Sequence, residues 1–180
     1  MKKIFHLNLK LLTILLFTIM STKTVKANKS NFITLKTSKG SIVIKTLPKI
    51  APNHVKRIKD LVSSGFYNGI VFHRVIKGFM AQTGDPLGNG TGGSGKNLKA
   101  EFSDYKYKYG TVGMARSMNP DSGDSQFFIC FDGCGHLTGQ YTVWGQVETG
   151  MEVVEKIEIG EPPSNPDKII EAFVGKKKTK

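Results

Sequence analysis

From residue 32 onward, the chain alternates short apolar runs with turn residues. Residues 32–36 and 41–45 are rich in β-branched side chains and flank a polar turn at residues 37–40, which predicts an opening hairpin. Further strand-like runs follow at 70–76, 79–83, 111–116, 126–131, 141–147 and 168–174. Short strands separated by turn residues in this way favour an antiparallel sheet over parallel βαβ units.

Two segments show the helical period instead. Residues 52–65 begin with Pro52, carry apolar side chains at 3.6-residue spacing and reach Gly65, a pattern typical of a helix with a glycine stop. A second, shorter helix is predicted at residues 151–157. We therefore expect a closed or nearly closed antiparallel sheet with two helices inserted between its strands.

Two consecutive strands place polar side chains among large apolar ones. Successive side chains on a strand leave opposite faces, so Phe72, Arg74 and Ile76 would share one face, and Met80 and Gln82 would share a face of the next strand. An arginine in a core is costly unless it is paired. The pattern predicts a surface groove with an apolar floor and a polar rim, which suits a short extended peptide carrying a proline.

Residues 1–27 differ from the rest of the chain. Lysines precede an apolar run at residues 11–20, and Val25 and Ala27 supply small residues at a signal-peptidase site. The alternative, a membrane anchor, is disfavoured because a transmembrane helix needs about twenty apolar residues. We expect cleavage after Ala27 and a periplasmic or secreted protein with no membrane association afterwards.

The net charge changes when these segments are set aside. The formal charge of +12 falls to +7 without the five lysines of residues 1–27, and to about +3 without the four lysines of residues 176–180. A folded domain at residues 28–175 with so small a charge is not expected to bind nucleic acid. Residues 176–180 are expected to form a disordered, solvated basic tail.

Cys130 and Cys134 are the two cysteines of the chain. In an extended segment their Cα atoms would lie about 13 Å apart, whereas a disulfide needs about 4.4–6.8 Å. A disulfide therefore requires a turn, which Asp132 and Gly133 could provide. The favoured alternative is a buried Cys130 and an exposed, unpaired Cys134. No histidine stands at a zinc-binding spacing beside them.

Local motifs raise two other possible functions. Residues 88–93 match a dinucleotide-binding glycine pattern and residues 90–96 a phosphate loop, but no helix is predicted after them to face a phosphate. His73, Asp85 and Ser125 are the residue types of a hydrolase triad, but bulky side chains follow the serine. Neither reading is favoured, and residues 84–95 are expected to form a long loop.

Several motifs in sequence order resemble the cyclophilins, the peptidyl-prolyl cis/trans isomerases, and the resemblance covers about residues 32–173. The matching segments are residues 72–76, 78–85, 113–116 and 125–129, together with Leu137 and residues 141–145. The resemblance implies a closed eight-stranded antiparallel β-barrel capped by two α-helices, with the site on its outer face. It implies no metal and no cofactor.

The resemblance also assigns roles residue by residue. Arg74 would be the catalytic donor to the prolyl nitrogen, and Gln82 would hold the substrate backbone. The remaining substrate-binding residues would be Phe79, Met80, Phe128 and Leu137 in the proline pocket, Ala115 and Arg116 at its rim, Gln126 beside them, and His136 and Tyr141 at the substrate site. The expected partners are proline-containing peptides and unfolded exported proteins, whose folding the enzyme would assist as a monomer.

Some positions depart from the common family pattern. His136 stands where many eukaryotic cyclophilins carry tryptophan and Tyr141 where they carry histidine, choices that resemble the bacterial exported branch. The missing tryptophan implies weak cyclosporin binding. Arg116 replaces a common asparagine and Asp124 a common glycine, so the subsite preference stays open. A non-catalytic peptide-binding chaperone on the same fold remains the alternative function.

Overall fold

A computed structural model of the protein describes residues 30–176. The predicted signal peptide at residues 1–27 and residues 177–180 of the predicted tail lie outside the described residues. The expectations of cleavage after Ala27 and of a disordered tail therefore stay predictions.

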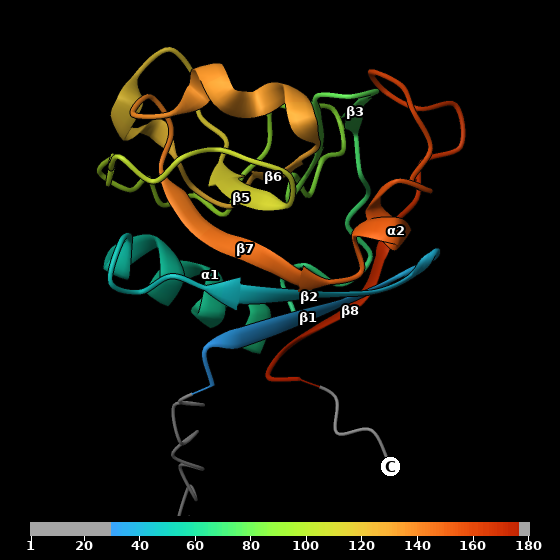
Figure 1. Ribbon diagram of the computed structural model, residues 1–180. Helices are drawn as coiled ribbons and strands as arrows, with labels where there is room; N and C mark the ends of the chain where they lie inside the picture. Colours follow the sequence, from blue (N-terminus) through green and yellow to red (C-terminus); the bar gives the residue numbers. More distant parts are fainter. Residues whose placement is uncertain (1–29, 177–180) are drawn as a thin grey trace, which may run out of the picture.

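Eight antiparallel strands form one sheet, as the sequence predicted (Figure 1). Their order across the sheet is β3-β4-β6-β5-β7-β2-β1-β8. The strands are β1 (Phe32–Thr37), β2 (Gly40–Thr46), β3 (Arg74–Ile76), β4 (Met80–Thr83), β5 (Thr111–Met114), β6 (Phe127–Cys130), β7 (Val143–Thr149) and β8 (Ile169–Val174).

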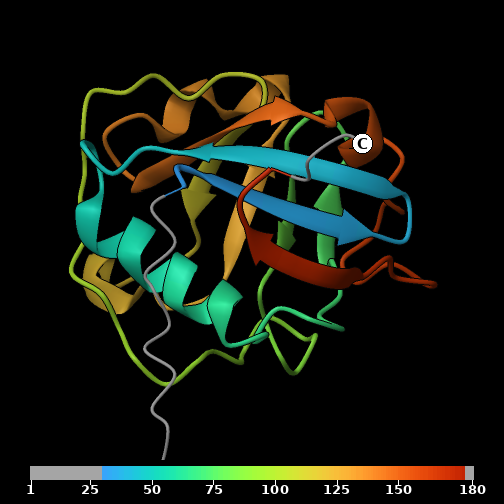
Figure 2. The same cartoon turned by 90° about the horizontal axis from the view of Figure 1, so that it is seen from below.

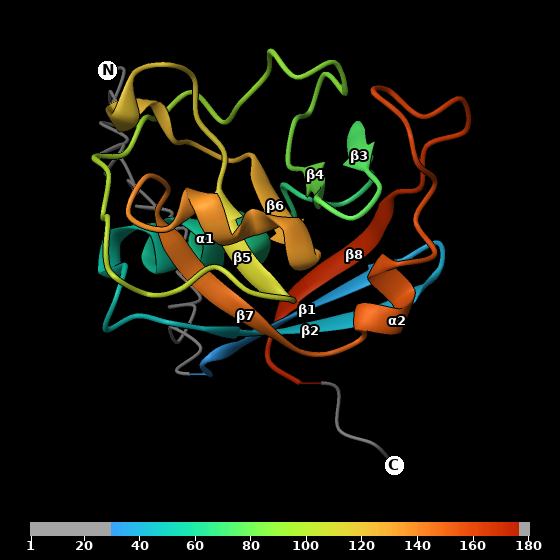
Figure 3. The ribbon, with the colours of Figure 1, turned by 45° about the horizontal axis from the view of Figure 1, so that its top comes forward.

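The sheet curls but does not close, so the predicted closed barrel is wrong. β3 and β8 are its two edges, and only isolated bridges, between Val71 and Lys168 and between Val75 and Gly160, connect their neighbourhoods. β3 is three residues long and forms its ladder with β4, not with β8. The segment between α2 and β8 lies beside β3 instead (Figure 3). The result is an open half-barrel.

Helices occur where the periodicity predicted them. α1 (Pro52–Ser63) packs against β7 and β8 (Figure 2), and α2 (Met151–Val154) packs against β2. α2 is shorter than predicted, although Ile157 beyond its end is still buried. Two short 3₁₀ helices lie in the connections before and after β6, namely η1 (Pro120–Ser122) and η2 (Asp132–Leu137). Within residues 30–176, no helix is long and apolar enough to span a membrane.

The strands separate two apolar clusters. The inner cluster, which includes Phe127, Ile129 and Trp144, is packed with α1, and the rings of Phe127 and Trp144 meet edge to face at 5.3 Å. The outer cluster lies on the opposite face and consists of Met80, Tyr107, Phe128, Cys130, Cys134, Leu137 and Val143. Phe72 belongs to the inner cluster, so it does not share the outer face with Arg74.

Candidate active site

A row of directly opposed residues crosses four strands on the outer face. Arg74 on β3 pairs with Gln82 on β4, Gln82 with Phe128 on β6, and Phe128 with Gly113 on β5. Directly opposed residues on antiparallel strands project to the same side of the sheet. The register therefore sets a guanidinium, a carboxamide and an aromatic ring next to one another.

A cavity of about 290 Å³ opens above this row. Ten of the residues predicted from the sequence line it, namely Arg74, Phe79, Met80, Gln82, Ala115, Arg116, Phe128, His136, Leu137 and Tyr141. Gln126 lines a neighbouring hollow instead. We call the cavity the proline pocket, after the ring that the family resemblance leads us to expect in it. The structure thus brings the predicted residues together on one surface.

The floor of the proline pocket is apolar and its rim is aromatic and polar. Met80, Phe128 and Leu137 are buried at its base. Phe79 stacks on the exposed imidazole of His136, with their rings 5.6 Å apart. Ring faces and aliphatic groups of this kind suit a pyrrolidine ring, which has no hydrogen-bond donor.

Two residues behind the pocket were not predicted from the sequence. The buried ring of Tyr107 stacks on Phe128 at 5.8 Å. A Cβ atom at Gly113 would lie 2.5 Å from the Phe128 ring and 2.1 Å from the Tyr107 hydroxyl, so only glycine leaves room for both rings. Nothing in the spacing of residues 105–109 marks Tyr107 out, because it contacts Phe128 only through the fold.

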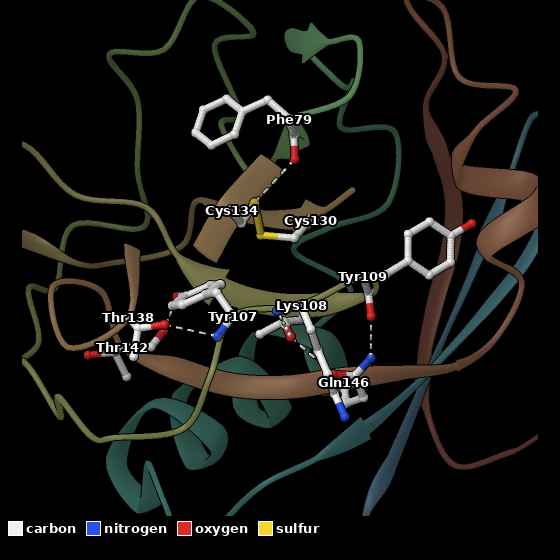
Figure 4. Close-up of a disulfide and its surroundings, with 10 residues drawn as sticks. Phe79, Tyr107, Lys108, Tyr109, Cys130, Cys134, Thr138, Thr142 and Gln146 are labelled. Atoms are coloured by element: carbon white, nitrogen blue, oxygen red, sulfur yellow. Dashed lines mark hydrogen bonds between the residues drawn. A yellow bond between two sulfur atoms is a disulfide. The ribbon is translucent and has the colours of Figure 1, made fainter. Parts of the chain in front are cut away.

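A disulfide joins Cys130 to Cys134 beneath the pocket (Figure 4), so the expectation of an exposed, unpaired Cys134 is wrong. Both cysteines are fully buried. The 3₁₀ turn of η2 brings their Cα atoms to 6.0 Å, the shortening that an extended segment cannot give. Because Leu137 ends η2, the disulfide ties one wall of the pocket to β6.

Arg74 is partly exposed and forms an ion pair. Its Nε donates to Oε2 of Glu161 at 2.7 Å, and the two side chains are 41% and 52% exposed. Arg74 still lines both the proline pocket and a further hollow of about 400 Å³ that Glu161 shares. Glu161 could not be found from the sequence, since it is 87 residues away.

Arg116 occupies the opposite rim. Its guanidinium carbon lies 4.4 Å from the centre of the Tyr141 ring, and its N–H groups donate to the backbone carbonyls of Gln140, Ser117 and Met118. These contacts fix a cation at the rim without a carboxylate partner among the described residues. The pocket is thus bordered by two arginines, of which one is paired with an acid.

Gln82 and Gln126 link the pocket to the glycine-rich loop. Nε2 of Gln82 donates to Oε1 of Gln126 at 2.9 Å, and Nε2 of Gln126 donates to the carbonyls of Gly90 and Gly92 at 3.0 and 2.8 Å. The side-chain Oε1 of Gln82 is left without a hydrogen-bond partner in the described part of the chain. A hollow of about 440 Å³ along this loop adjoins the proline pocket.

Asp85 organises the same loop from below. Its buried carboxylate accepts from the backbone N–H groups of Leu87 at 2.8 Å and Asn89 at 3.0 Å, and also from that of Gly90. Burial raises the pKa of Asp85, but the backbone donors lower it by more than burial raises it. The pKa therefore lies below its ordinary value. The loop is built around a carboxylate of its own.

The hydrolase reading does not survive this arrangement. Oγ of Ser125 donates to the carbonyl of Gly84 at 2.7 Å, and no hydrogen bond joins His73 to Ser125 or Asp85. His73 is buried, and burial together with the charge of Arg74 lowers its pKa, although Asp85 and Gln126 oppose the shift. His73 lines the hollow that Arg74 and Glu161 share.

The nucleotide and metal readings also find no support. No helix follows the glycine-rich loop, because residues 96–101 are extended or irregular. Among residues 30–176, no group of three or more histidine, cysteine, aspartate or glutamate side chains is placed to hold a metal ion.

Comparison with known proteins identifies the class to which this fold and pocket belong. The family model of "Cyclophilin type peptidyl-prolyl cis-trans isomerase/CLD" matches residues 32–174. The chain therefore belongs to the cyclophilin family, and its enzyme class is that of the peptidyl-prolyl cis/trans isomerases.

Relatives from bacteria are similar over most of their length. A "Probable peptidyl-prolyl cis-trans isomerase" of Brucella abortus (strain 2308) is 50% identical over 165 residues, which cover 82% of this chain and 84% of the relative. A "Peptidyl-prolyl cis-trans isomerase" of Helicobacter pylori (strain ATCC 700392 / 26695) is 44% identical over 137 residues, which cover 74% and 83%.

Solved structures show the same fold. A cyclophilin of Cryptosporidium parvum, crystallised in the presence of the dipeptide Ala-Pro, superposes with a TM-score of 0.76 at 28% identity, covering 81% of this chain and 99% of that one. Cyclophilin AquaCyp293 from Hirschia baltica gives 0.73 at 30% identity, covering 81% and 74%.

Proposed function

We propose that Arg74 catalyses rotation about the X-Pro bond of a peptide held in the proline pocket. The observation that carries the proposal is a cavity of about 290 Å³ with an apolar floor, which Arg74 and Gln82 also line. The cavity accommodates the ring, and the polar groups face the amide that must rotate.

The chemistry asked of the site is modest. Resonance in the amide sets a barrier of about 18–20 kcal/mol, and the prolyl nitrogen regains its lone pair as the bond twists. A donor placed at that nitrogen binds the twisted state better than either planar state. Acceleration from tens of seconds to milliseconds requires about 5.5 kcal/mol, of which one charge-assisted hydrogen bond supplies about 1.5–3 kcal/mol. Anchoring of the ring and backbone supplies the rest.

The other pocket residues anchor the peptide. The proline ring is held by Phe79, Met80, Phe128 and Leu137. The free side-chain Oε1 of Gln82 accepts a hydrogen bond from a substrate N–H. Ala115 and Arg116 border the residue before proline, Gln126 orients Gln82, and His136 and Tyr141 flank the ring. The similar Cryptosporidium parvum cyclophilin studied with Ala-Pro supports a proline-containing peptide as the ligand.

The test is an isomerisation assay on a short X-Pro peptide, in which NMR exchange measures the rate of cis/trans interconversion. Arg74→Ala should lower kcat/KM by roughly 10- to 150-fold, the equivalent of one charge-assisted hydrogen bond, while peptide binding is largely kept. Lys77→Ala is the matched control, because Lys77 is an exposed cation just beyond β3 and outside the proline pocket. A non-catalytic peptide-binding chaperone would show no acceleration in the wild type.

We also propose that the protein is exported and acts on unfolded exported proteins, as a monomer of the bacterial exported branch. The basic and apolar pattern of residues 1–27 supports export. Mass spectrometry of protein recovered from the periplasm or medium should give a chain beginning at Asn28, and light scattering should give the monomer mass. An intact N-terminus on cytoplasmic protein would overturn export.

Cyclosporin is expected to bind weakly. His136 supplies a small, polar ring at the rim where the resemblance places tryptophan in many eukaryotic cyclophilins, and it stacks on Phe79 rather than extending the apolar surface.

A further inference from the structure

The side chain that orients Arg74 comes from a segment outside the pocket. Oε2 of Glu161 accepts a hydrogen bond from Nε of Arg74 at 2.7 Å. The two Nη groups of Arg74 have no hydrogen-bond partner within residues 30–176. The contact therefore occupies one donor of the guanidinium and leaves the terminal donors available to a ligand.

The backbone holds Glu161 at this position. Gly160 and Val75, each next to a partner of the ion pair, exchange two backbone hydrogen bonds of 2.8 and 3.0 Å. The far end of the segment is fixed by Asp167, whose carboxylate accepts from Glu158 N–H at 2.9 Å and whose carbonyl accepts from Phe72 N–H at 2.8 Å. Gly160 and Asp167 of this segment are thus attached to Val75 and Phe72, which lie on either side of Arg74 in the sequence.

The turn at Gly160 has little freedom to change shape. Its φ is +156°, and a Cβ atom there would lie 2.4 Å from the Cα atom of Pro163. Pro162 and Pro163 restrict the backbone immediately after Glu161. A carboxylate carried on so constrained a segment keeps a defined position relative to β3.

We propose that Glu161 is a positioning residue that holds the Arg74 guanidinium through Nε, so that its Nη donors face the proline pocket. This inference rests on the proposed function of Arg74. An arginine side chain with one end free samples many rotamers, and a donor displaced by an ångström loses much of its effect on a transition state. Exposed ion pairs add little to folding stability, so the effect should appear in turnover.

Three variants test the proposal in the peptide isomerisation assay. Glu161→Ala should lower kcat roughly threefold to tenfold and leave KM within about twofold, because substrate anchoring is intact. Glu161→Gln should restore kcat to within about twofold, since the carboxamide oxygen can accept the same hydrogen bond. Glu158→Ala is the matched control, because Glu158 is exposed on the same segment and its carboxylate forms no ion pair among the described residues. It should behave as wild type.

The assay separates this proposal from the one on which it rests. If the wild type does not accelerate isomerisation, the proposed function fails. If Arg74→Ala is impaired but Glu161→Ala turns over as fast as wild type or faster, only the role of Glu161 fails. In the Arg74→Ala background, Glu161→Ala should cause no further loss, because the carboxylate acts through the missing guanidinium.

A measurement without substrate gives a second check. The ¹⁵N-edited NMR signal of the Arg74 Nε–H group should be protected from solvent exchange in the wild type and in Glu161→Gln. It should exchange faster in Glu161→Ala. Equal exchange in all three proteins would show that Glu161 does not hold the guanidinium, and would overturn the proposal.

Discussion

The two faces of β4, β5 and β6 are built from the same strands but closed in different ways. On the inner face, Phe127 and Ile129 pack into a cluster sealed by α1 and the rest of the sheet. On the outer face, Phe128 and Met80 are buried at the floor of a pocket that opens above them. One face serves the stability of the fold, and the other has surface left over for a ligand.

The outer face depends on segments outside the sheet. Leu137 arrives on η2 and the Tyr107 ring on the loop before β5. The Cys130–Cys134 disulfide holds η2 against β6. A change on the inner face should therefore lower stability, whereas a change on the outer face should alter binding more than stability.

The largest effect is expected from comparing two neighbouring phenylalanines. Phe127→Ala should lower the free energy of unfolding by about 3–5 kcal/mol, because it leaves a sealed cavity. Phe128→Ala should cost less, since the space it leaves joins an open pocket that water can fill, but it should raise KM for the peptide. Urea unfolding and peptide kinetics measure both quantities. Equal losses of stability with unchanged KM would contradict the division between the faces.

Removal of the disulfide should have the next largest effect. The double variant Cys130→Ala, Cys134→Ala should unfold about 2 kcal/mol more easily, the loss of loop-closure entropy expected for so short a loop. KM should also rise because Leu137 and His136 lose their fixed position. The control is the wild type treated with a dithiol reductant, which should show the same changes. If KM is unaffected, η2 does not depend on the disulfide for its position.

The glycine-rich loop should respond to acid through Asp85. The folded pKa of Asp85 is depressed, so its stabilisation is complete above the ordinary pKa of 3.8 and is lost as pH falls through the folded value. Asp85→Asn should cost about 1–2 kcal/mol at neutral pH and flatten the dependence of unfolding free energy on pH below about 4. An acid profile identical to that of the wild type would contradict the prediction.

The smallest effect is expected at the rim. His136→Trp should extend the apolar surface beside Phe79 and strengthen cyclosporin binding by about tenfold, or about 1.4 kcal/mol, with little change in stability. Isothermal titration calorimetry measures the affinity. A wild type that already binds cyclosporin as tightly as the variant would show that the imidazole does not limit binding.

The sequence allowed much of the outer face to be predicted, because strand alternation is local. Met80 and Gln82 lie on one face as their spacing predicted, and the apolar period of residues 52–62 appears as α1. The family resemblance predicted which residues would line the pocket, and ten of them line one cavity. Their roles in catalysis and binding stay predictions.

What the sequence did not reveal depends on contacts between distant segments. Closure of the sheet is decided by whether β3 and β8 meet, which no local pattern records. The disulfide required the particular turn of η2, and the contact of Glu161 with Arg74 required the path of the chain after α2. Each is a property of the assembled fold rather than of residue spacing.

The open seam of the half-barrel has a consequence for solubility. An unpaired strand edge can recruit another chain and seed aggregation. Here the segment before β8 covers β3, since Gly160 pairs with Val75 and the carbonyl of Asp167 accepts from Phe72 N–H. The segment that carries Glu161 to the pocket therefore also disfavours self-association, and a deletion within it would expose a strand edge able to pair with another molecule.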